Sequence, residues 1–111
     1  MRLRFTSLSV LAALTAWIGV ASASAPKAPP SSPELLEKGK ASYNMNCAAC
    51  HGEKGAGDGA AAAALNPKPR SFVTDTFKNG EKLENVFKST SEGLPGTVMV
   101  AFAHLPEEER W

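Results

Sequence analysis

The feature that most constrains this chain is the segment CAACH at residues 47–51, which brings two thiols and an imidazole together. This C-x-x-C-H arrangement is typical of the covalent attachment of c-type haem. Two thiols separated by two residues can each reach one vinyl group of a porphyrin, and the adjacent histidine then lies under the iron. Ala48 and Ala49 are small, so the turn can lie close to the ring. The motif therefore predicts one covalent haem c, held by Cys47 and Cys50, with His51 as the proximal iron ligand.

Three other interpretations of the same residues are weaker. A C-x-x-C pair can be a redox dithiol, but the thioredoxin-like form needs a βαβ surround that this sequence does not predict. A zinc site has four candidate ligands in the chain: Cys47, Cys50, His51 and His104. The adjacency of Cys50 and His51 makes a tetrahedral arrangement poor. A disulfide across so short a loop would add little stability, because that gain grows with loop length.

The N-terminus has the three-part layout of a secretory signal. Arg2 and Arg4 provide a positive start, residues 8–20 are apolar, and small residues follow at 21–25. The apolar stretch is too short to span a bilayer comfortably. We expect residues 1–23 to be a signal peptide cleaved after Ala23, with an uncleaved anchor as the alternative. Cleavage leaves no stable membrane span and places the protein in the periplasm or outside the cell, where haem of this kind is attached.

The length and charge of the chain limit its possible folds and partners. A chain of 111 residues predicts one small domain. The 12 basic and 11 acidic residues give a formal net charge of +1, which argues against nucleic acid as a partner. Aromatic residues are few and alanines many, so the core is thin. A small domain of this kind needs a reinforcement, and a covalently bonded apolar cofactor would be one.

The periodicity along the chain predicts an all-α domain at residues 33–111, after a leader rich in Pro, Ser and Ala at 24–32. A first helix covers 33–46, with Ser31 or Ser32 as its cap. A glycine-rich loop follows residue 51, and a short helical turn lies at 60–65. A second helix covers 81–91, where Glu84 and Lys88 can pair, and Gly93 ends it. A last helix begins at Pro106.

The stretch from Glu34 to Trp111 resembles the class I c-type cytochromes, a family of small monohaem all-α proteins. The features that match, in the family's order, are Gly39 and Tyr43, the motif at 47–51, Pro67 and Pro69, and Gly96-x-x-Met99. The resemblance implies a cytochrome c-like fold around one haem. It also implies that the last helix packs across the first near Gly39 and Tyr43. Only the opening turn of that helix is present, so we expect the natural reading frame to continue past Trp111.

The resemblance implies that Met99 is the distal iron ligand, and ordinary core packing is the alternative role for this side chain. The family often has proline on both sides of this methionine, where this chain has Val98 and Val100. His104 is the rival ligand. Met45 is a poor one, since its helix holds it on the histidine side of the ring. A backbone carbonyl near a proline orients the proximal imidazole in the family, and here the candidates are Pro67 and Pro69.

These features predict an electron carrier and not an enzyme, with iron cycling between Fe(II) and Fe(III) under His/Met ligation. We expect a monomer that docks transiently with redox protein partners. Basic side chains that can steer such encounters are Lys54, Lys68, Arg70, Lys78 and Lys82. Two alternatives remain open. The chain can be the haem-bearing domain or subunit of a larger oxidoreductase complex, or a five-coordinate haem protein that binds or senses gases.

Overall fold

The computed structural model describes residues 26–111, so the predicted signal peptide at 1–23 lies outside the described residues. The helical elements, in chain order, are α1 (Pro33–Asn46), α2 (Ala48–His51), the 3-10 turn η1 (Ala62–Ala64), α3 (Leu83–Glu92) and α4 (Glu107–Arg110). Residues 26–111 contain no strand, which confirms the predicted all-α class. No helix in this range is long and apolar enough to cross a membrane.

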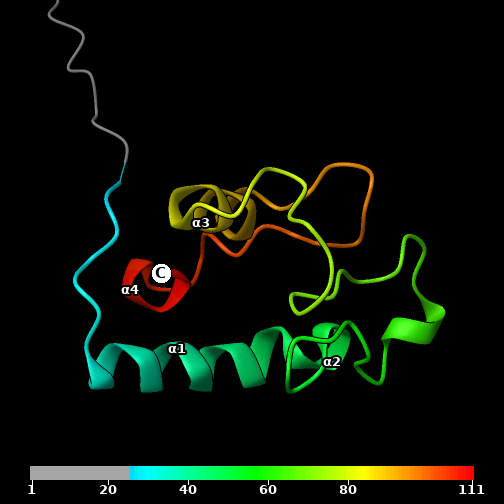
Figure 1. The fold of residues 1–111 in the computed structure, drawn as a ribbon, viewed down its shortest axis with the longest axis horizontal. Helices are drawn as coiled ribbons and strands as arrows, with labels where there is room; N and C mark the ends of the chain where they lie inside the picture. The colour runs from blue at the N-terminus through cyan, green and yellow to red at the C-terminus, as the bar shows by residue number, and fades with distance from the viewer. Residues whose placement is uncertain (1–25) are drawn as a thin grey trace, which may run out of the picture.

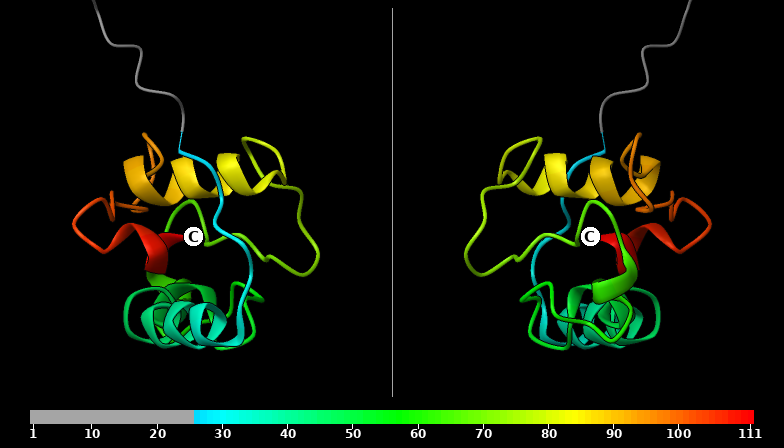
Figure 2. Two further views of the ribbon diagram at one scale, coloured as in Figure 1. Left: turned by 90° about the vertical axis from the view of Figure 1, so that its left-hand side faces the viewer. Right: turned by 90° about the vertical axis from the view of Figure 1, so that its right-hand side faces the viewer.

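The helices lie on opposite sides of the domain and are joined by long loops (Figure 1). Helix α1 runs along one side and α2 continues from its end, while α3 lies on the other side and crosses the direction of α1 (Figure 2). Helix α4 lies between them at one end. This arrangement leaves the remaining sides of the domain to be closed by loops.

Helix α1 has the bounds that the sequence predicts. Ser32 caps it, because its side-chain oxygen accepts a hydrogen bond from the backbone N–H of Leu35 at 3.2 Å. Pro33 follows at the first helical position, where its missing N–H costs nothing. At the other end, the N–H of Cys47 still donates to the carbonyl of Tyr43 at 2.8 Å. The first cysteine is therefore attached directly to a well-ended helix.

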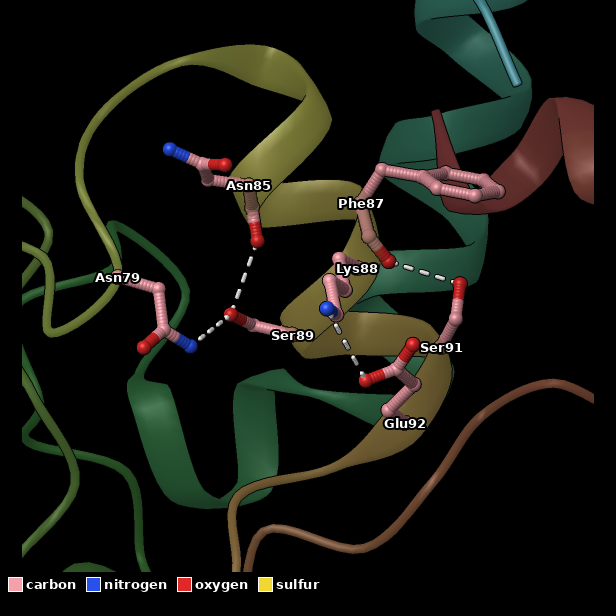
Figure 3. A network of polar contacts seen from close by, with 7 residues as sticks. All are labelled: Asn79, Asn85, Phe87, Lys88, Ser89, Ser91 and Glu92. Atoms are coloured by element: carbon pink, nitrogen blue, oxygen red, sulfur yellow. Dashed lines mark hydrogen bonds and ion pairs between the residues drawn. The ribbon is translucent and has the colours of Figure 1, made fainter. Parts of the chain in front are cut away.

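Helix α3 begins at Leu83, two residues after the predicted start, and ends against Gly93 as predicted. The predicted pairing of Glu84 with Lys88 was wrong: Lys88 approaches Glu92 at 4.0 Å instead (Figure 3). Both pairings have the i, i+4 spacing, so spacing alone does not choose between them.

A short polar network ties the preceding loop to α3 (Figure 3). The hydroxyl of Ser89 donates to the carbonyl of Asn85 and accepts from the side-chain amide of Asn79, both at 2.9 Å. Two residues later, the Ser91 hydroxyl donates to the Phe87 carbonyl at 2.7 Å. The network holds the segment around residue 79 beside the helix.

The short helix α4 packs on both long helices, α1 and α3. Lys38 of α1 pairs with Glu108 of α4 at 2.8 Å, and the hydrogen bond to Glu108 raises the pKa of Lys38. The indole of Trp111 stacks on Phe87 of α3 with 4.0 Å between ring centroids. The Arg110 guanidinium lies 4.7 Å from the centroid of the same Phe87 ring. The predicted contact near Gly39 is confirmed, because the Glu109 carbonyl lies over that glycine.

The protein core is as thin as the composition predicts. Within residues 26–111, the only apolar side chains that are buried are Ala62 and Phe87. Several large apolar side chains stay exposed, among them Leu83 of α3 and the two valines that flank Met99. Contacts between protein side chains therefore do not by themselves form a closed core between the helices.

Candidate haem site

The CAACH motif forms the single helical turn α2 and the residue before it. The N–H groups of Cys50 and His51 both donate to the Cys47 carbonyl, at 3.1 and 2.9 Å. The turn ends at Gly52, whose N–H donates to the Ala48 carbonyl at 2.8 Å. This geometry places Cys47, Cys50 and His51 on one compact turn, as the spacing of the motif predicts.

The glycine-rich loop after the motif supplies the hydrogen-bond donors that this turn lacks. Its N–H groups bind three carbonyls of the turn: Ala61 to Ala49 at 2.9 Å, Gly59 to Cys50 at 3.1 Å and Gly57 to His51 at 2.8 Å. A helix end leaves its last carbonyls without partners inside the helix. The loop is therefore a cap for the haem-attachment turn, a role that the sequence alone did not predict.

Replacing Gly59 by alanine should lower the free energy of unfolding by about 3 kcal/mol or more, because overpacking against backbone forces the turn to shift. A Cβ at this position would lie 2.6 Å from the Ala48 carbonyl oxygen and 2.5 Å from the Ala49 carbonyl carbon. Urea unfolding measures the change. Gly96→Ala is the matched control, since Gly96 has φ +79° but a Cβ there would meet no atom within 4 Å. The control should lower the free energy of unfolding by only about 1 kcal/mol, because alanine disfavours the left-handed backbone conformation of Gly96. Equal losses of stability in the two variants would contradict the predicted clash at residue 59.

The imidazole of His51 is oriented by a backbone carbonyl, but not by the one predicted. Its Nδ1 donates to the carbonyl oxygen of Arg70 at 3.1 Å. The predicted candidates for this acceptor, Pro67 and Pro69, were therefore wrong. The carbonyl that accepts the hydrogen bond belongs to the residue after Pro69. With the proton on Nδ1, the other ring nitrogen, Nε2, is left with its lone pair free to bind iron.

The loop packing explains why Arg70 supplies this carbonyl. The Pro69 carbonyl lies against Gly57, where a Cβ would meet it at 2.7 Å. The N–H of Phe72 donates to the Gly55 carbonyl at 2.7 Å. These two contacts hold the segment against the glycine loop, and the carbonyl between them, that of Arg70, faces the imidazole.

Two adjoining hollows, of about 550 and 510 Å³, lie between the helices. They share seven lining side chains, which come from α2, α3, the junction of α1 with α2 and the loops: Cys47, His51, Phe72, Val86, Thr90, Met99 and Phe102. Cys50 lines the second hollow. The structure thus brings the two cysteines, the histidine and the predicted methionine to one space, although Met99 is far from the motif in sequence. His104 is exposed and lines neither hollow.

Met99 lies in a loop that is closed by its own hydrogen bonds. Its carbonyl accepts from the N–H of Leu94 at 2.9 Å, and its N–H donates to the Thr97 hydroxyl oxygen at 3.0 Å. The same hydroxyl donates to the Leu94 carbonyl at 2.7 Å. These bonds restrain the loop although Val98 and Val100 stand where the family often has prolines.

The residues around these hollows fit a haem. Each volume falls within the range of pockets that hold cofactors, roughly 300–1,000 Å³. Apolar side chains such as Val86 and Phe102 face the space, and Val98 and Val100, which line the second hollow, are 55% and 62% exposed. A large apolar group in this space would cover them. Thioether sulfur and imidazole nitrogen are also ligands that haem iron takes in proteins. Among residues 26–111, no three His, Cys, Asp or Glu side chains form a group that could hold a metal ion.

Tyr43 links α1 to the attachment turn, because its hydroxyl donates to the Gly52 carbonyl at 2.7 Å. Burial of the side chain raises the pKa of Tyr43 above 10.0, and Cys47 and Asp58 add smaller effects of the same sign. Burial likewise raises the pKa of the Cys47 thiol, with Cys50 adding to it. The Tyr43 hydroxyl is therefore protonated at neutral pH, and so is the Cys47 thiol before haem is bonded to it.

Replacing Tyr43 by phenylalanine should lower the free energy of unfolding at pH 7 by about 0.5–1.5 kcal/mol, the usual net value of one hydrogen bond. A raised pKa in the folded state stabilises the protein below the unfolded pKa of 10.0, and this contribution is lost as pH rises through the folded value. The difference between the wild type and Tyr43→Phe should therefore shrink above pH 10. Urea unfolding at pH 7 and pH 11 checks this, and a difference that does not change with pH would contradict it.

An all-α domain of this size, with a C-x-x-C-H turn facing a cofactor-sized hollow, defines a small c-type haem protein. Comparison with known proteins agrees. The cytochrome c family model matches residues 36–111. One chain of the reducing HAO-like protein complex of Kuenenia stuttgartiensis has a similar fold, with a TM-score of 0.62 and 34% sequence identity. That match covers 67% of this chain but only 37% of the other. No curated protein matches significantly.

The chain belongs to the cytochrome c family. It therefore carries covalent haem c, and its chemistry is haem-based electron transfer.

Proposed function

We propose that the protein is an electron carrier whose haem c is fastened through Cys47 and Cys50, with His51 and Met99 as the axial ligands of the iron. The observation that carries this proposal is that all four side chains line one continuous space, in which the Nδ1 of His51 already has a partner. When bound, haem supplies an iron that takes up and releases one electron. Two protein ligands would leave that iron no open position for a substrate.

The chain's own residues have three tasks in this proposal. The attachment turn and its glycine cap hold the cysteines in place. The Arg70 carbonyl keeps the His51 ring in the tautomer that presents Nε2. Apolar side chains, among them Val86 and Phe102, exclude water around the ligands, which helps to set the reduction potential.

Absorption spectroscopy of the purified protein, oxidised and reduced, tests the haem type and the ligands together. We expect a c-type spectrum, with a weak red band in the oxidised protein that reports methionine–iron ligation. The colour should stay with the polypeptide after denaturation and extraction with acidified solvent. Extraction of the colour would refute the thioether links. A missing red band together with carbon monoxide binding would favour the five-coordinate, gas-binding alternative.

A second candidate is a haem-bearing domain or subunit of a larger oxidoreductase complex. The similarity to one chain of the Kuenenia stuttgartiensis complex favours it, because this chain corresponds to only 37% of that one. Purification of the native protein under mild conditions distinguishes the two roles. A stable co-purifying enzyme would support the subunit role, and a monomer that exchanges electrons in brief encounters would support the carrier.

We also propose that partners dock where basic side chains border the second hollow. Lys68, Arg70 and Lys78 line it, whereas Lys54 and Lys82, also predicted for this rim, do not. Such charges speed encounters with an acidic partner, and the effect weakens as salt increases. Lys78→Glu should slow electron transfer to an acidic acceptor several-fold at low ionic strength. Lys27→Glu, in the exposed leader, is the control and should not. A rate that does not depend on salt would contradict this.

Export remains part of the proposal, with residues 1–23 as a cleaved signal peptide and the periplasm or exterior as the location. N-terminal sequencing of the natural protein tests it directly. We expect the mature chain to begin at Ser24.

A further inference from the structure

The imidazole of His51 has a second restraint besides the Arg70 carbonyl. The ring of Phe72 stacks on it, with 4.5 Å between centroids and 20° between planes. Phe77 in turn stacks on Phe72, at 5.6 Å and 7°. Phe72 is thus stacked against two flat rings, one of which belongs to the candidate iron ligand.

Phe72 is held in this position from two directions. Its backbone N–H donates to the Gly55 carbonyl at 2.7 Å. Its ring also lies directly against Gly55, where a Cβ would come within 3.0 Å of the ring carbon Cδ2. The Phe72 ring therefore packs against the backbone of Gly55, and this contact limits its movement away from His51.

A tight turn returns the chain so that Phe77 covers Phe72. The backbone N–H of Ser71 donates to the Asp75 carboxylate at 3.1 Å, and that of Asp75 donates to the Ser71 carbonyl at 3.1 Å. The Ser71 hydroxyl accepts from the N–H groups of Val73 and Thr74, both at 3.2 Å. This turn holds the Phe77 ring next to the Phe72 ring.

Phe72 contributes little to a protein core, since it is 40% exposed. A partly exposed phenylalanine that stacks on an imidazole has a more specific effect, namely on the orientation of that imidazole. The hydrogen bond from Nδ1 to Arg70 restrains one edge of the His51 ring and leaves rotation of its plane less restricted. A flat ring stacked on its face opposes that rotation.

We propose that Phe72 is a positioning residue that fixes the plane of the His51 imidazole, and thereby the orientation of the proximal ligand toward the iron. This inference rests on the proposed function, in which His51 binds haem iron. It adds to the site a residue that the motif does not contain and that acts on the iron ligand through His51.

Proton NMR of the ferric holoprotein tests the proposal. The plane of an axial imidazole determines how unpaired spin is distributed over the porphyrin, and the four haem methyl resonances report that distribution. Phe72→Leu keeps an apolar side chain but removes the flat face, so we expect the order or the spread of the four methyl shifts to change. Phe72→Tyr retains the face and should restore the wild-type pattern. Val73→Ala is the matched control on the same turn, because Val73 is 69% exposed and lines neither hollow, and its pattern should stay close to that of the wild type.

An unchanged methyl pattern in Phe72→Leu, with covalent haem and histidine ligation intact, would overturn the inference and leave the proposed function standing. Loss of covalent haem or of histidine ligation in the wild type would instead overturn the proposed function. If Phe72→Leu does not accumulate as holoprotein, Phe72→Met provides the same comparison with a flexible side chain. A wild-type pattern in Phe72→Met would likewise refute the role of Phe72.

Discussion

A protein in which Cys47 and Cys50 are both replaced by alanine should accumulate without covalent haem and largely unfolded. Only Ala62 and Phe87 are buried apolar side chains within the described part of the chain, so the polypeptide alone has little core. Binding of a group that the folded state holds and the unfolded state does not is itself folding free energy. Haem staining of a denaturing gel measures attachment, and far-ultraviolet circular dichroism measures helix content. We expect no stain and a loss of most of the helical signal.

The single variants Cys47→Ala and Cys50→Ala sharpen this test. Each retains one thiol, so each should retain stain on the gel. Each should also shift the reduced absorption band to longer wavelength, because one vinyl group stays conjugated with the porphyrin. Met45→Ala is the matched control near the motif, since Met45 is 78% exposed, and it should behave as the wild type. A double variant with native helix content and no haem would contradict the claim that haem completes the core.

Replacing Met99 by alanine should abolish the red absorption band of the oxidised protein and lower its reduction potential. A thioether ligand stabilises ferrous iron, and the fall should be a sizeable fraction of the roughly 0.8 V over which axial ligands tune haem proteins. The variant should also bind carbon monoxide when reduced, because a coordination position opens. Redox titration and absorption spectroscopy provide both measurements.

His104→Ala separates the two candidate distal ligands. His104 is exposed and lines neither hollow, so this variant should keep the red band and the wild-type potential. If His104→Ala lost the band and Met99→Ala kept it, the proposed assignment would be reversed. If neither changed the spectrum and the wild type bound carbon monoxide, the five-coordinate alternative would hold.

Local features of the sequence predicted the helices well because each depends on near neighbours. The cap at Ser32 and the proline after it give α1 its start, and the cysteine motif follows its last residue. Helix α3 was located by the apolar spacing of its residues, although its first residue lies two positions later than predicted. That start has no side-chain cap, since Lys82 occupies the capping position, so the sequence carries no sharp marker there.

Partners between segments were predicted less well. The carbonyl of Arg70, and not that of Pro67 or Pro69, binds His51, because packing against Gly55 and Gly57 decides which carbonyl of the extended segment points inward. The stacking of Phe72 on His51 has no sequence signature of its own. Neither contact follows from residue spacing, because each depends on how one loop lies on another.

By itself, the sequence determined the attachment chemistry and the all-α class, since the spacing of two thiols and a histidine within one turn needs no distant residue. The tertiary structure brings Met99, which the resemblance implied as a ligand, to the same space as His51, and it alone decided which groups hold the imidazole in place. The physical reason is the range of the interactions. A helical turn is closed by hydrogen bonds between residues four apart, whereas a cofactor pocket is assembled by loops that meet only after the helices have packed.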